Sequence, residues 1–296
     1  MSFVNRGKER QRLISIMDDY LAAVLARNFS GLKLAANFKH TENGVALPLG
    51  AGMVRTIRSK RPGGQYFVDV ATGQVEHWGV VVEDAGEAIY GVRLRVNGLL
   101  ISEIETLRVG NTEPYYFPDV ILKEDPGFHE IIPADQRSSR EELIEIANRY
   151  FDAIEHNDGS MVPVKGDCQR LVNGAEDTVA DVSALGEGHE HRALSVRDQI
   201  SGGHYAYIEG LRARRFPLID EERGFVLAHV LFDHPGDLPG PNGSVPFGTP
   251  NSMVAFEIFK VKSKSVDAVW AICYSVPYGS ASGWGEGSPR SAIDIS

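Results

Sequence analysis

Residues that can transfer protons stand inside the apolar segments of this sequence. In FVLAHVLFDHPG (225–236), strand alternation places His229 on the same face as Leu227 and Leu231. An imidazole among aliphatic side chains is either a core histidine with satisfied hydrogen bonds or a base that burial keeps neutral. The sequence leaves both interpretations of His229 open.

Two arginines share one face of another predicted strand. In EAIYGVRLRVNG (87–98), Gly91, Arg93 and Arg95 lie on one face, and aromatic and aliphatic side chains lie on the other. The arginines either face solvent or line a pocket. In a dry pocket an arginine would stabilise a phenolate or enolate, because its charge is poorly screened there.

Further polar and aromatic residues are candidates for a binding site. Tyr66 and His204 open corresponding predicted strands in the two halves, and either could donate a hydrogen bond to a developing oxyanion or simply pack at a strand edge. Arg55 begins the basic segment RTIRSKRPGG (55–64), which is a solvated loop or a lid over a pocket. Tyr278 could stack on an aromatic ligand, although most such side chains belong to cores or interfaces.

Several familiar catalytic motifs are missing. The sequence contains no G-x-S-x-G elbow, Walker loop or HExxH, and GAGMVR (50–55) lacks the third glycine of a dinucleotide-binding loop. His189 and His191, in LGEGHEHR, would need further ligands to hold a metal; an exposed loop or a pocket lid is the alternative. We therefore expect no metal and no cofactor, and acid–base chemistry by side chains alone.

Length and composition are those of a globular protein. A chain of 296 residues suits two domains of about 130–150 residues each. The net charge of −10 opposes a nucleic-acid partner, because phosphate binding needs clustered Lys and Arg. No run of about 18–20 apolar residues could cross a membrane, and the N-terminus lacks a signal-peptide core, so we expect a cytoplasmic protein. Cys168 and Cys273 are expected to be reduced thiols.

The two halves of the sequence repeat one pattern. DDYLAAVLARN (18–28) is echoed by NRYFDAIEHND (148–158), and HTENG (40–44) by RLVNG (170–174). The same 130 positions separate Tyr20 from Tyr150 and Asn43 from Asn173. In each half, a long predicted helix is followed by a short helical segment, a turn and several strands with period-2 alternation.

Helices followed by antiparallel strands predict an α+β fold. We expect two cone-shaped domains, in each of which a bent, mostly antiparallel sheet wraps over N-terminal helices. The predicted boundaries are 1–110 for the first domain, 111–137 for an ordered connecting strap, and 138–296 for the second domain. A pocket between the concave face of the sheet and the helices is a common position for a ligand.

The sequence resembles the SnoaL-like branch of the nuclear transport factor 2 and ketosteroid isomerase superfamily, in tandem. The segments that carry the resemblance span most of residues 8–284: DYLAAVLARN, FKHTENGVALPLGAGMVRT, TGQVEHWGVV, SEIETLRV, CQRLVNG, RRFPLIDEERGFVLAHVLFDHPG, EIFKV and VPYGSASGW. The resemblance implies a pocket-facing residue at His40, before the TENG turn. It also implies a catalytic base at Asp69, which interrupts YFVDV; a paired carboxylate at a strand end is the alternative.

Architecture and length are similar to those of a sphingomonad diarylpropane lyase of this superfamily, which deformylates a lignin-derived aromatic dimer without a cofactor. The similarity implies a lyase for a small hydrophobic aromatic substrate. The alternatives are an isomerase or cyclase of polyketide- or steroid-like ligands and a non-catalytic binding protein. Cone folds of this type commonly pair through the outer sheet face, so we expect a homo-oligomer. The predicted catalytic residues are His40, Tyr66, Asp69, Arg93 and His229, and the predicted substrate-binding residues are Arg55, Arg95, His204 and Tyr278.

Overall fold

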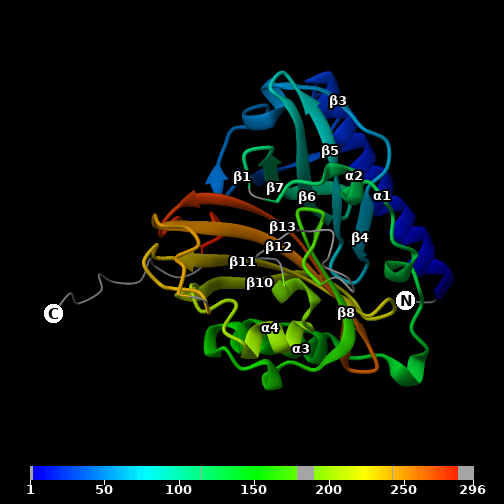
Figure 1. Ribbon diagram of the computed structural model, residues 1–296. Coiled ribbons are helices and arrows are strands. Elements are labelled where there is room, and N and C mark those ends of the chain that lie inside the picture. Colours follow the sequence, from blue (N-terminus) through cyan, green and yellow to red (C-terminus); the bar gives the residue numbers. More distant parts are fainter. Residues whose placement is uncertain (1–2, 114, 179–189, 242, 286–296) are drawn as a thin grey trace.

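The chain folds into two α+β units, each built from one sheet and its own helices. The computed structural model describes residues 3–113, 115–178, 190–241 and 243–285. In Figure 1 the first sheet lies above the second, with α1 flanking the first sheet and α3 and α4 beneath the second. The predicted α+β fold with two sheets is confirmed. Within the described residues, no helix combines the length and the apolar character needed to span a membrane.

The first unit consists of a long helix, a seven-stranded sheet and one short 3-10 helix. Its elements are α1 (Phe3–Ala26), β1 (Leu34–Glu42), β2 (Val45–Ala46), η1 (Gly52–Arg55), β3 (Ile57–Lys60), β4 (Gln65–Asp69), β5 (Gln74–Glu83), β6 (Gly86–Asn97) and β7 (Leu100–Gly110). In its described residues, the segment that joins the units forms only short helices, α2 (Pro118–Ile121), η2 (Pro126–Phe128) and η3 (Ala134–Gln136).

The second unit repeats this plan with a six-stranded sheet. Its elements are α3 (Arg140–His156), η4 (Gly159–Met161), β8 (Val164–Val172), β9 (Ala175–Glu176), η5 (Glu190–Ala193), α4 (Val196–Ser201), β10 (Gly210–Asp220), β11 (Phe225–His234), β12 (Asn251–Lys262) and β13 (Ser265–Pro277). Ser139 caps α3 through a capping box with Glu142, as the Ser-Ser-Arg-Glu-Glu sequence favours.

Both sheets have the same strand order. The first runs β2-β1-β7-β6-β5-β3, with β4 also paired to β5, and the second runs β9-β8-β13-β12-β11-β10. Asn43 and Asn173 follow β1 and β8 in left-handed conformations, each with φ 49°, which asparagine tolerates better than most residues. Each Asn side chain exchanges two hydrogen bonds with the backbone of the neighbouring strand, at Arg108 and at Cys273 respectively.

The segment before each Asn-Gly turn is a strand, so the helical assignment of these residues is wrong. β1 pairs parallel with β7, where His40 lies opposite Ile104, and β8 pairs parallel with β13, where Arg170 lies opposite Val269. Local sequence does not reveal such a pairing, because the partner strand lies more than 60 residues further along the chain.

Each sheet packs one face on its own helices and the other face on the other sheet. The inner face of the first sheet covers α1 residues such as Leu13 and Met17, and that of the second covers α3 residues such as Leu143 and Phe151. The outer faces meet in a shared apolar cluster that includes Trp78 of β5, Phe256 of β12 and Phe128 of the connecting segment. The faces expected to form a homo-oligomer are therefore covered within one chain.

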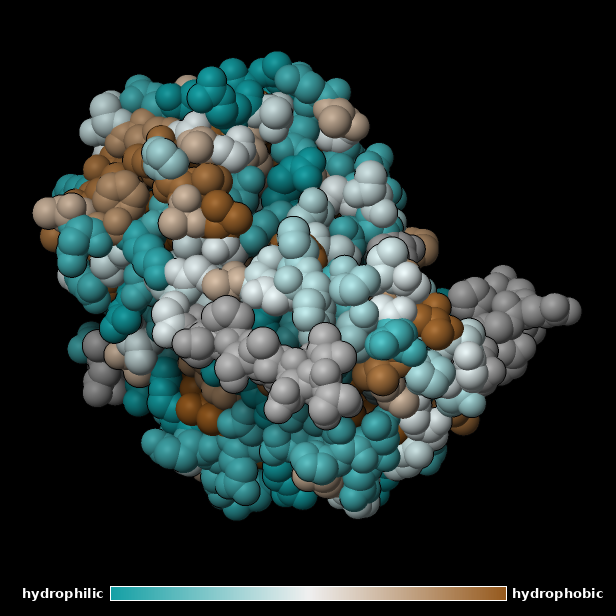
Figure 2. All heavy atoms as spheres, turned by 90° about the vertical axis from the view of Figure 1, so that its left-hand side faces the viewer, coloured by the Kyte–Doolittle hydropathy of each residue, from teal (hydrophilic) through white to brown (hydrophobic). Residues whose placement is uncertain are grey.

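Apolar atoms also reach the surface. On the side of the molecule seen in Figure 2, brown atoms gather on the upper, first unit, whereas the bottom of the second unit is mainly hydrophilic. An assembly of several chains would use a surface other than the outer sheet faces, which pack against each other within one chain.

Candidate active site

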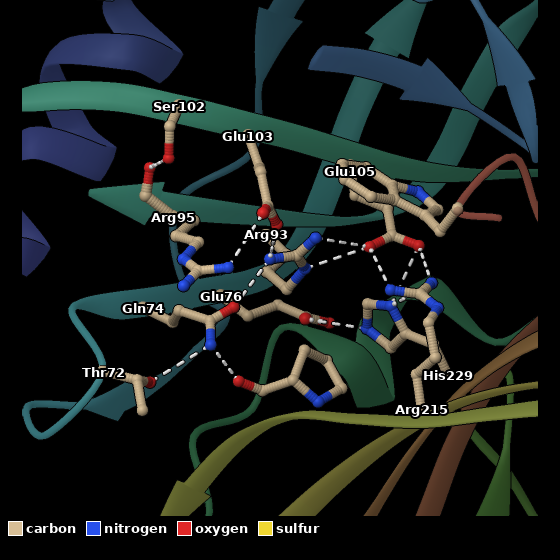
Figure 3. A network of polar contacts seen from close by, with 12 residues as sticks. Thr72, Gln74, Glu76, Arg93, Arg95, Ser102, Glu103, Glu105, Arg215 and His229 are labelled. Atoms are coloured by element: carbon tan, nitrogen blue, oxygen red, sulfur yellow. Dashed lines mark hydrogen bonds and ion pairs between the residues drawn. The ribbon is translucent and has the colours of Figure 1, made fainter. Parts of the chain in front are cut away.

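Arg93 and His229 meet in a buried charged cluster between the two units (Figure 3). Arg93 donates to Glu105 Oε2 from Nε at 3.0 Å and from Nη2 at 2.8 Å, and it also contacts Gln74 and Glu103. His229 places Nε2 at 3.2 Å from Glu76 Oε2 and Nδ1 at 3.1 Å from Glu105 Oε1. This arrangement joins the units and leaves His229 no ring nitrogen for a ligand.

The charges of the cluster compensate one another. Burial alone would raise the pKa of Glu105, but His229, Arg93 and Arg215 together hold it well below its ordinary value. The His229 ring also stacks on Phe256, with centroids 3.6 Å apart and an interplanar angle of 3°. Phe256 belongs to the apolar cluster between the sheets, so His229 lies on the outer face of its sheet.

Asp69 also bridges the units. Its carboxylate accepts hydrogen bonds from the backbone N–H groups of Ala71 (2.9 Å) and Ile219 (3.1 Å) and pairs with Arg140. The buried carboxylate accepts hydrogen bonds from five donors among the described residues. It therefore behaves as the paired carboxylate that the sequence offered as the alternative to a base.

His40 and Tyr66 lie in the first unit, whose inner face is packed with side chains. His40 is buried in β1, and within the described residues its Nδ1 has no hydrogen-bond partner. Burial lowers its pKa, partly opposed by the backbone at Pro48 and Leu47. The hydroxyl of Tyr66 donates a hydrogen bond to Asp18 of α1. The pKa of this phenol is raised, mainly by burial and also by the neighbouring Asp18 carboxylate.

The four predicted substrate-binding residues are widely separated. Arg55 is exposed on η1, and Arg95 is about half exposed and pairs with Glu103. The hydroxyl of Tyr278 donates to Glu209 on the surface of the second unit. Only His204, which lies in the turn after α4 rather than at the start of a strand, lines the cavity described next.

The second unit encloses a cavity of about 250 Å³ on the inner face of its sheet. Small side chains on neighbouring strands, Ala255, Ala271 and Cys273, leave this space open. The rest of the wall combines aromatic, aliphatic and polar residues from β8, β11, β12, the connecting segment and further loops: Glu113, Tyr115, Arg170, Val172, Asn173, Asp177, His204, Tyr205, Tyr207, Ile208, Phe232, His234, Pro246, Phe247, Met253 and Glu257.

Glu257 of β12 is the most perturbed carboxyl group of this cavity. Its side chain is buried, and within the described part of the chain its Oε2 has no hydrogen-bond partner. Burial raises the pKa of Glu257 to about 7, even though Arg170 and the Tyr150 hydroxyl both act to lower it. A carboxyl group with such a pKa exchanges protons readily near neutral pH.

Arg170 of β8 carries the positive charge of the cavity. Its Nη1 donates to Asp177 Oδ2 at 2.7 Å and to Gln199 Oε1 at 3.4 Å. Its guanidinium group also lies over the ring of Tyr205, 4.5 Å from the ring centroid. Arg170 occupies the position of the second half that corresponds to His40 in the first, 130 residues earlier.

A third group of cavity residues is aromatic. His234 lies against Phe247, with ring centroids 4.4 Å apart, and stacks on Tyr207 at 5.7 Å. Burial lowers the pKa of His234 to about 4, although Asn251 and Asp233 oppose the shift, so this imidazole is neutral at pH 7. Burial likewise raises the pKa of the Cys273 thiol, which makes it a poor nucleophile.

Sequence reasoning missed Glu257, although a signal for it exists. Glu257 interrupts the apolar run VAFEIF (254–259) just as Asp69 interrupts YFVDV, and a lone carboxylate inside a strand is a site candidate in both cases. Only the structure distinguishes the two, because Asp69 points to the other unit and Glu257 lines the cavity.

The described residues form no cluster of three or more side chains suited to a metal ion. The candidate metal site at His189 and His191 falls outside what the structure describes.

A family model and several solved structures are each similar to slightly less than half of this chain. Residues 136–273 match the family model of a domain of unknown function (DUF8021). No curated protein matches the sequence.

Solved structures with a similar fold include three small proteins. A Bacillus subtilis protein, provisionally described as an isomerase, is 10% identical and covers 45% of this chain and 87% of its own, with a TM-score of 0.32. AusH from Aspergillus nidulans is 16% identical over 46% of this chain and 86% of its own, with a TM-score of 0.29. An NTF2-like protein from Cytophaga hutchinsonii is 14% identical over 46% of this chain and 99% of its own, with a TM-score of 0.28. Similarity at this level transfers no function.

Proposed function

We propose that this chain is an enzyme that moves a proton on a small, largely apolar molecule bound in the cavity of the second unit, with Glu257 as the acid–base residue. The observation that carries the proposal is a buried carboxyl group in the wall of a cavity, with a pKa of about 7 and an oxygen that has no partner among the described residues. Perturbed carboxyl groups of this kind concentrate at catalytic sites.

The cavity limits the size and character of the substrate. Its volume of about 250 Å³ is slightly below the usual range of roughly 300–1,000 Å³ for small-molecule pockets. The rings of Tyr207, His234 and Phe247 provide flat apolar surface on which an aromatic or otherwise planar molecule can stack. These features favour a ligand of about two fused or linked rings.

Proton transfer by Glu257 suits an isomerase or cyclase. The ionised carboxylate would take a proton from a carbon next to a carbonyl group, and the neutral acid would return it to another atom of the same molecule. The surrounding wall would exclude water from the intermediate. His234 is neutral at pH 7 and can donate or accept a hydrogen bond without adding a charge.

A lyase that acts on a lignin-derived aromatic dimer is the second candidate, and the aromatic lining of the cavity favours it. In this reaction Glu257 would take the proton of a hydroxymethyl group of a quinone-methide-like intermediate. The carbon–carbon bond would then break, formaldehyde would leave, and the electron pair would rearomatise the ring. The choice of a lignin-derived substrate and of a lyase reaction rests on the resemblance noted in the sequence.

The test is the turnover of two substrate classes by the wild-type chain and by Glu257→Gln. Isomerisation of bicyclic β,γ-unsaturated ketones would be followed by the absorbance of the conjugated product, and cleavage of a phenolic diarylpropane by the release of formaldehyde. The variant should lose about 100-fold or more in kcat, the usual contribution of a general base. Glu176→Gln, which changes an exposed carboxylate of the same unit, is the control.

Two outcomes would count against the proposal. Wild-type turnover by Glu257→Gln would show that another group moves the proton. Failure of the wild-type chain to convert either class would favour the alternative of a non-catalytic binding protein. For the active enzyme, kcat/KM should rise with pH and level off above about pH 7, because the base must be ionised.

A further inference from the structure

Arg170, which lines the same cavity as Glu257, has a buried donor without a partner among the described residues. The residue is 8% exposed, and within the described residues its Nε–H has no acceptor. A buried charged donor without an acceptor costs about 1–3 kcal/mol or more, so such groups in native proteins have a partner in the functional state. The missing partner of Arg170 is an oxygen that the described side chains do not supply.

The guanidinium group is held in one orientation by its other contacts. Both hydrogen bonds of Nη1 go to the protein, to Asp177 and Gln199, and one face of the group lies on Tyr205. The hydroxyl of Tyr205 in turn donates to Gln199 Oε1 at 3.0 Å. The edge formed by Nε and Nη2 is therefore preorganised rather than flexible, which is what stabilisation of a developing charge requires.

Arg170 and Glu257 complement each other across the cavity. Among the described residues, Arg170 lacks an acceptor at Nε and Glu257 lacks a donor at Oε2, yet the two side chains do not satisfy each other. They are close enough for the positive charge of Arg170 to lower the pKa of Glu257. The two groups together suit a molecule with an oxygen that accepts from Arg170 Nε–H and, nearby, an acidic proton that Glu257 can take.

We propose that Arg170 is a second catalytic residue, which binds the substrate oxygen that becomes negatively charged when Glu257 removes the proton. The substrate is accordingly a ketone, an aldehyde or a phenol. When the C–H or O–H bond breaks, the proton goes to Glu257 and the electron pair ends on the oxygen next to Arg170. The pair forms the new bond when Glu257 returns the proton. This inference rests on the proposed function of Glu257.

The role of Asp177, Gln199 and Tyr205 follows from this assignment. They do not touch the reacting oxygen but position the group that does. Asp177 also balances the charge of Arg170, so that the empty cavity does not hold an unpaired cation. The three residues are positioning residues for Arg170.

Binding of 2-naphthol and naphthalene tests the inference without turnover. The two molecules share a ring system, and only the first has an oxygen for Arg170. The wild-type chain should bind 2-naphthol more tightly than naphthalene, as measured by fluorescence titration. Arg170→Met should weaken the binding of 2-naphthol by about 10- to 100-fold and leave the affinity for naphthalene within about threefold, because only the charged hydrogen bond is lost.

Arg170→Lys provides a second variant in case the methionine variant does not fold. Lysine keeps the charge but not the planar edge, so the preference for 2-naphthol should fall by about tenfold. Three results would overturn the inference. They are no preference for 2-naphthol in the wild-type chain, an unchanged preference in the two Arg170 variants, or an equal loss of affinity for 2-naphthol and naphthalene. The last result would show that Arg170 only maintains the shape of the cavity.

The same titration separates this inference from the proposed function. Glu257→Gln should still bind 2-naphthol, because Arg170 and its positioning residues remain in place, but it should not turn over substrate. An Arg170 variant with normal 2-naphthol binding would refute the role of Arg170 and leave that of Glu257 intact. Normal turnover by Glu257→Gln would refute the proposed function itself.

Discussion

The inner faces of the two sheets present different side chains at corresponding positions. Arg108 and Cys273 correspond, because each exchanges hydrogen bonds with the asparagine of its turn, Asn43 or Asn173. Tyr90 lies opposite Arg108 on the neighbouring strand, and Ala255 lies opposite Cys273. A tyrosine in the first unit thus takes the place of an alanine in the second.

This exchange fills one cone and leaves the other open. The Tyr90 hydroxyl is 2.9 Å from His77 Nδ1, and both side chains are buried. Gly79 makes room for them, because a Cβ atom there would lie 2.9 Å from the Tyr90 hydroxyl. The positions that correspond to His77 and Gly79 are Ala228 and Val230. Alanines thus stand where the first unit has the rings of Tyr90 and His77, and the valine at the glycine position adds less volume than these two rings remove. The first cone is thus packed with side chains whereas the second has a cavity, and this difference supports the proposal that the second unit binds the ligand.

Ala255→Tyr should convert the second cone into a copy of the first. The new ring would occupy the cavity of about 250 Å³, so affinity for 2-naphthol and any turnover should fall by more than about 100-fold. Ligand titration and calorimetric melting would show whether the loss occurs in a folded protein. Ala255→Val adds much less volume and is the matched control. Retention of binding by the tyrosine variant would mean that the ligand site lies elsewhere.

Arg93→Ala tests whether the charged cluster between the sheets is structural. The variant leaves Glu105, Glu103 and Gln74 with fewer partners at a buried site, so the free energy of unfolding should fall by about 3–5 kcal/mol in denaturant titrations. Arg95→Ala, two residues along the same strand but half exposed, should change it by less than about 0.5 kcal/mol. Equal effects of the two variants would contradict the buried role of Arg93.

Tyr90→Ala should open a cavity in the first cone. Loss of the ring and of the hydrogen bond to His77 should lower the free energy of unfolding by about 3–5 kcal/mol, as for other large-to-small substitutions in cores. Tyr90→Phe keeps the ring and should cost about 1 kcal/mol. A neutral effect of Tyr90→Ala would mean that the first cone is not tightly packed.

Glu257→Gln should stabilise the fold in a pH-dependent way. Burial raises the pKa of Glu257 from 4.5 to about 7, so the folded state binds a proton that the unfolded state releases between these values. Wild-type stability therefore falls as the pH rises from about 4.5 to 7, by about 3 kcal/mol in total.

The glutamine variant has no such loss. It should match the wild type near pH 4 and exceed it by up to about 3 kcal/mol above pH 7, as measured by denaturant unfolding at both pH values. Glu176→Gln, at an exposed position, should behave like the wild type at both. If Glu257→Gln and the wild type had the same free energy of unfolding at pH 8, ionisation of Glu257 in the folded protein would cost little free energy.

Local patterns predicted much of the fold. Strand alternation placed His229 with Leu227 and Leu231, and the structure has all three on one face. The Asn-Gly turns and the period-2 segments likewise predicted two sheets with their own helices. The parallel strands β1 and β8 were missed, because their partners are the last strands of each unit and lie far away in the sequence.

The sequence by itself determined which side chains share a face, since alternation is a property of each strand. It could not show which face would meet the other unit, because both faces of these sheets are apolar and carry ionisable residues. Tertiary packing alone decided that His229 and Asp69 contact the other unit and that Arg93 pairs with the same Glu105 as His229. It also decided that Arg170 and Glu257 line a cavity. The physical reason is that a cavity depends on the volumes of side chains from several strands and loops together, and no single segment contains that information.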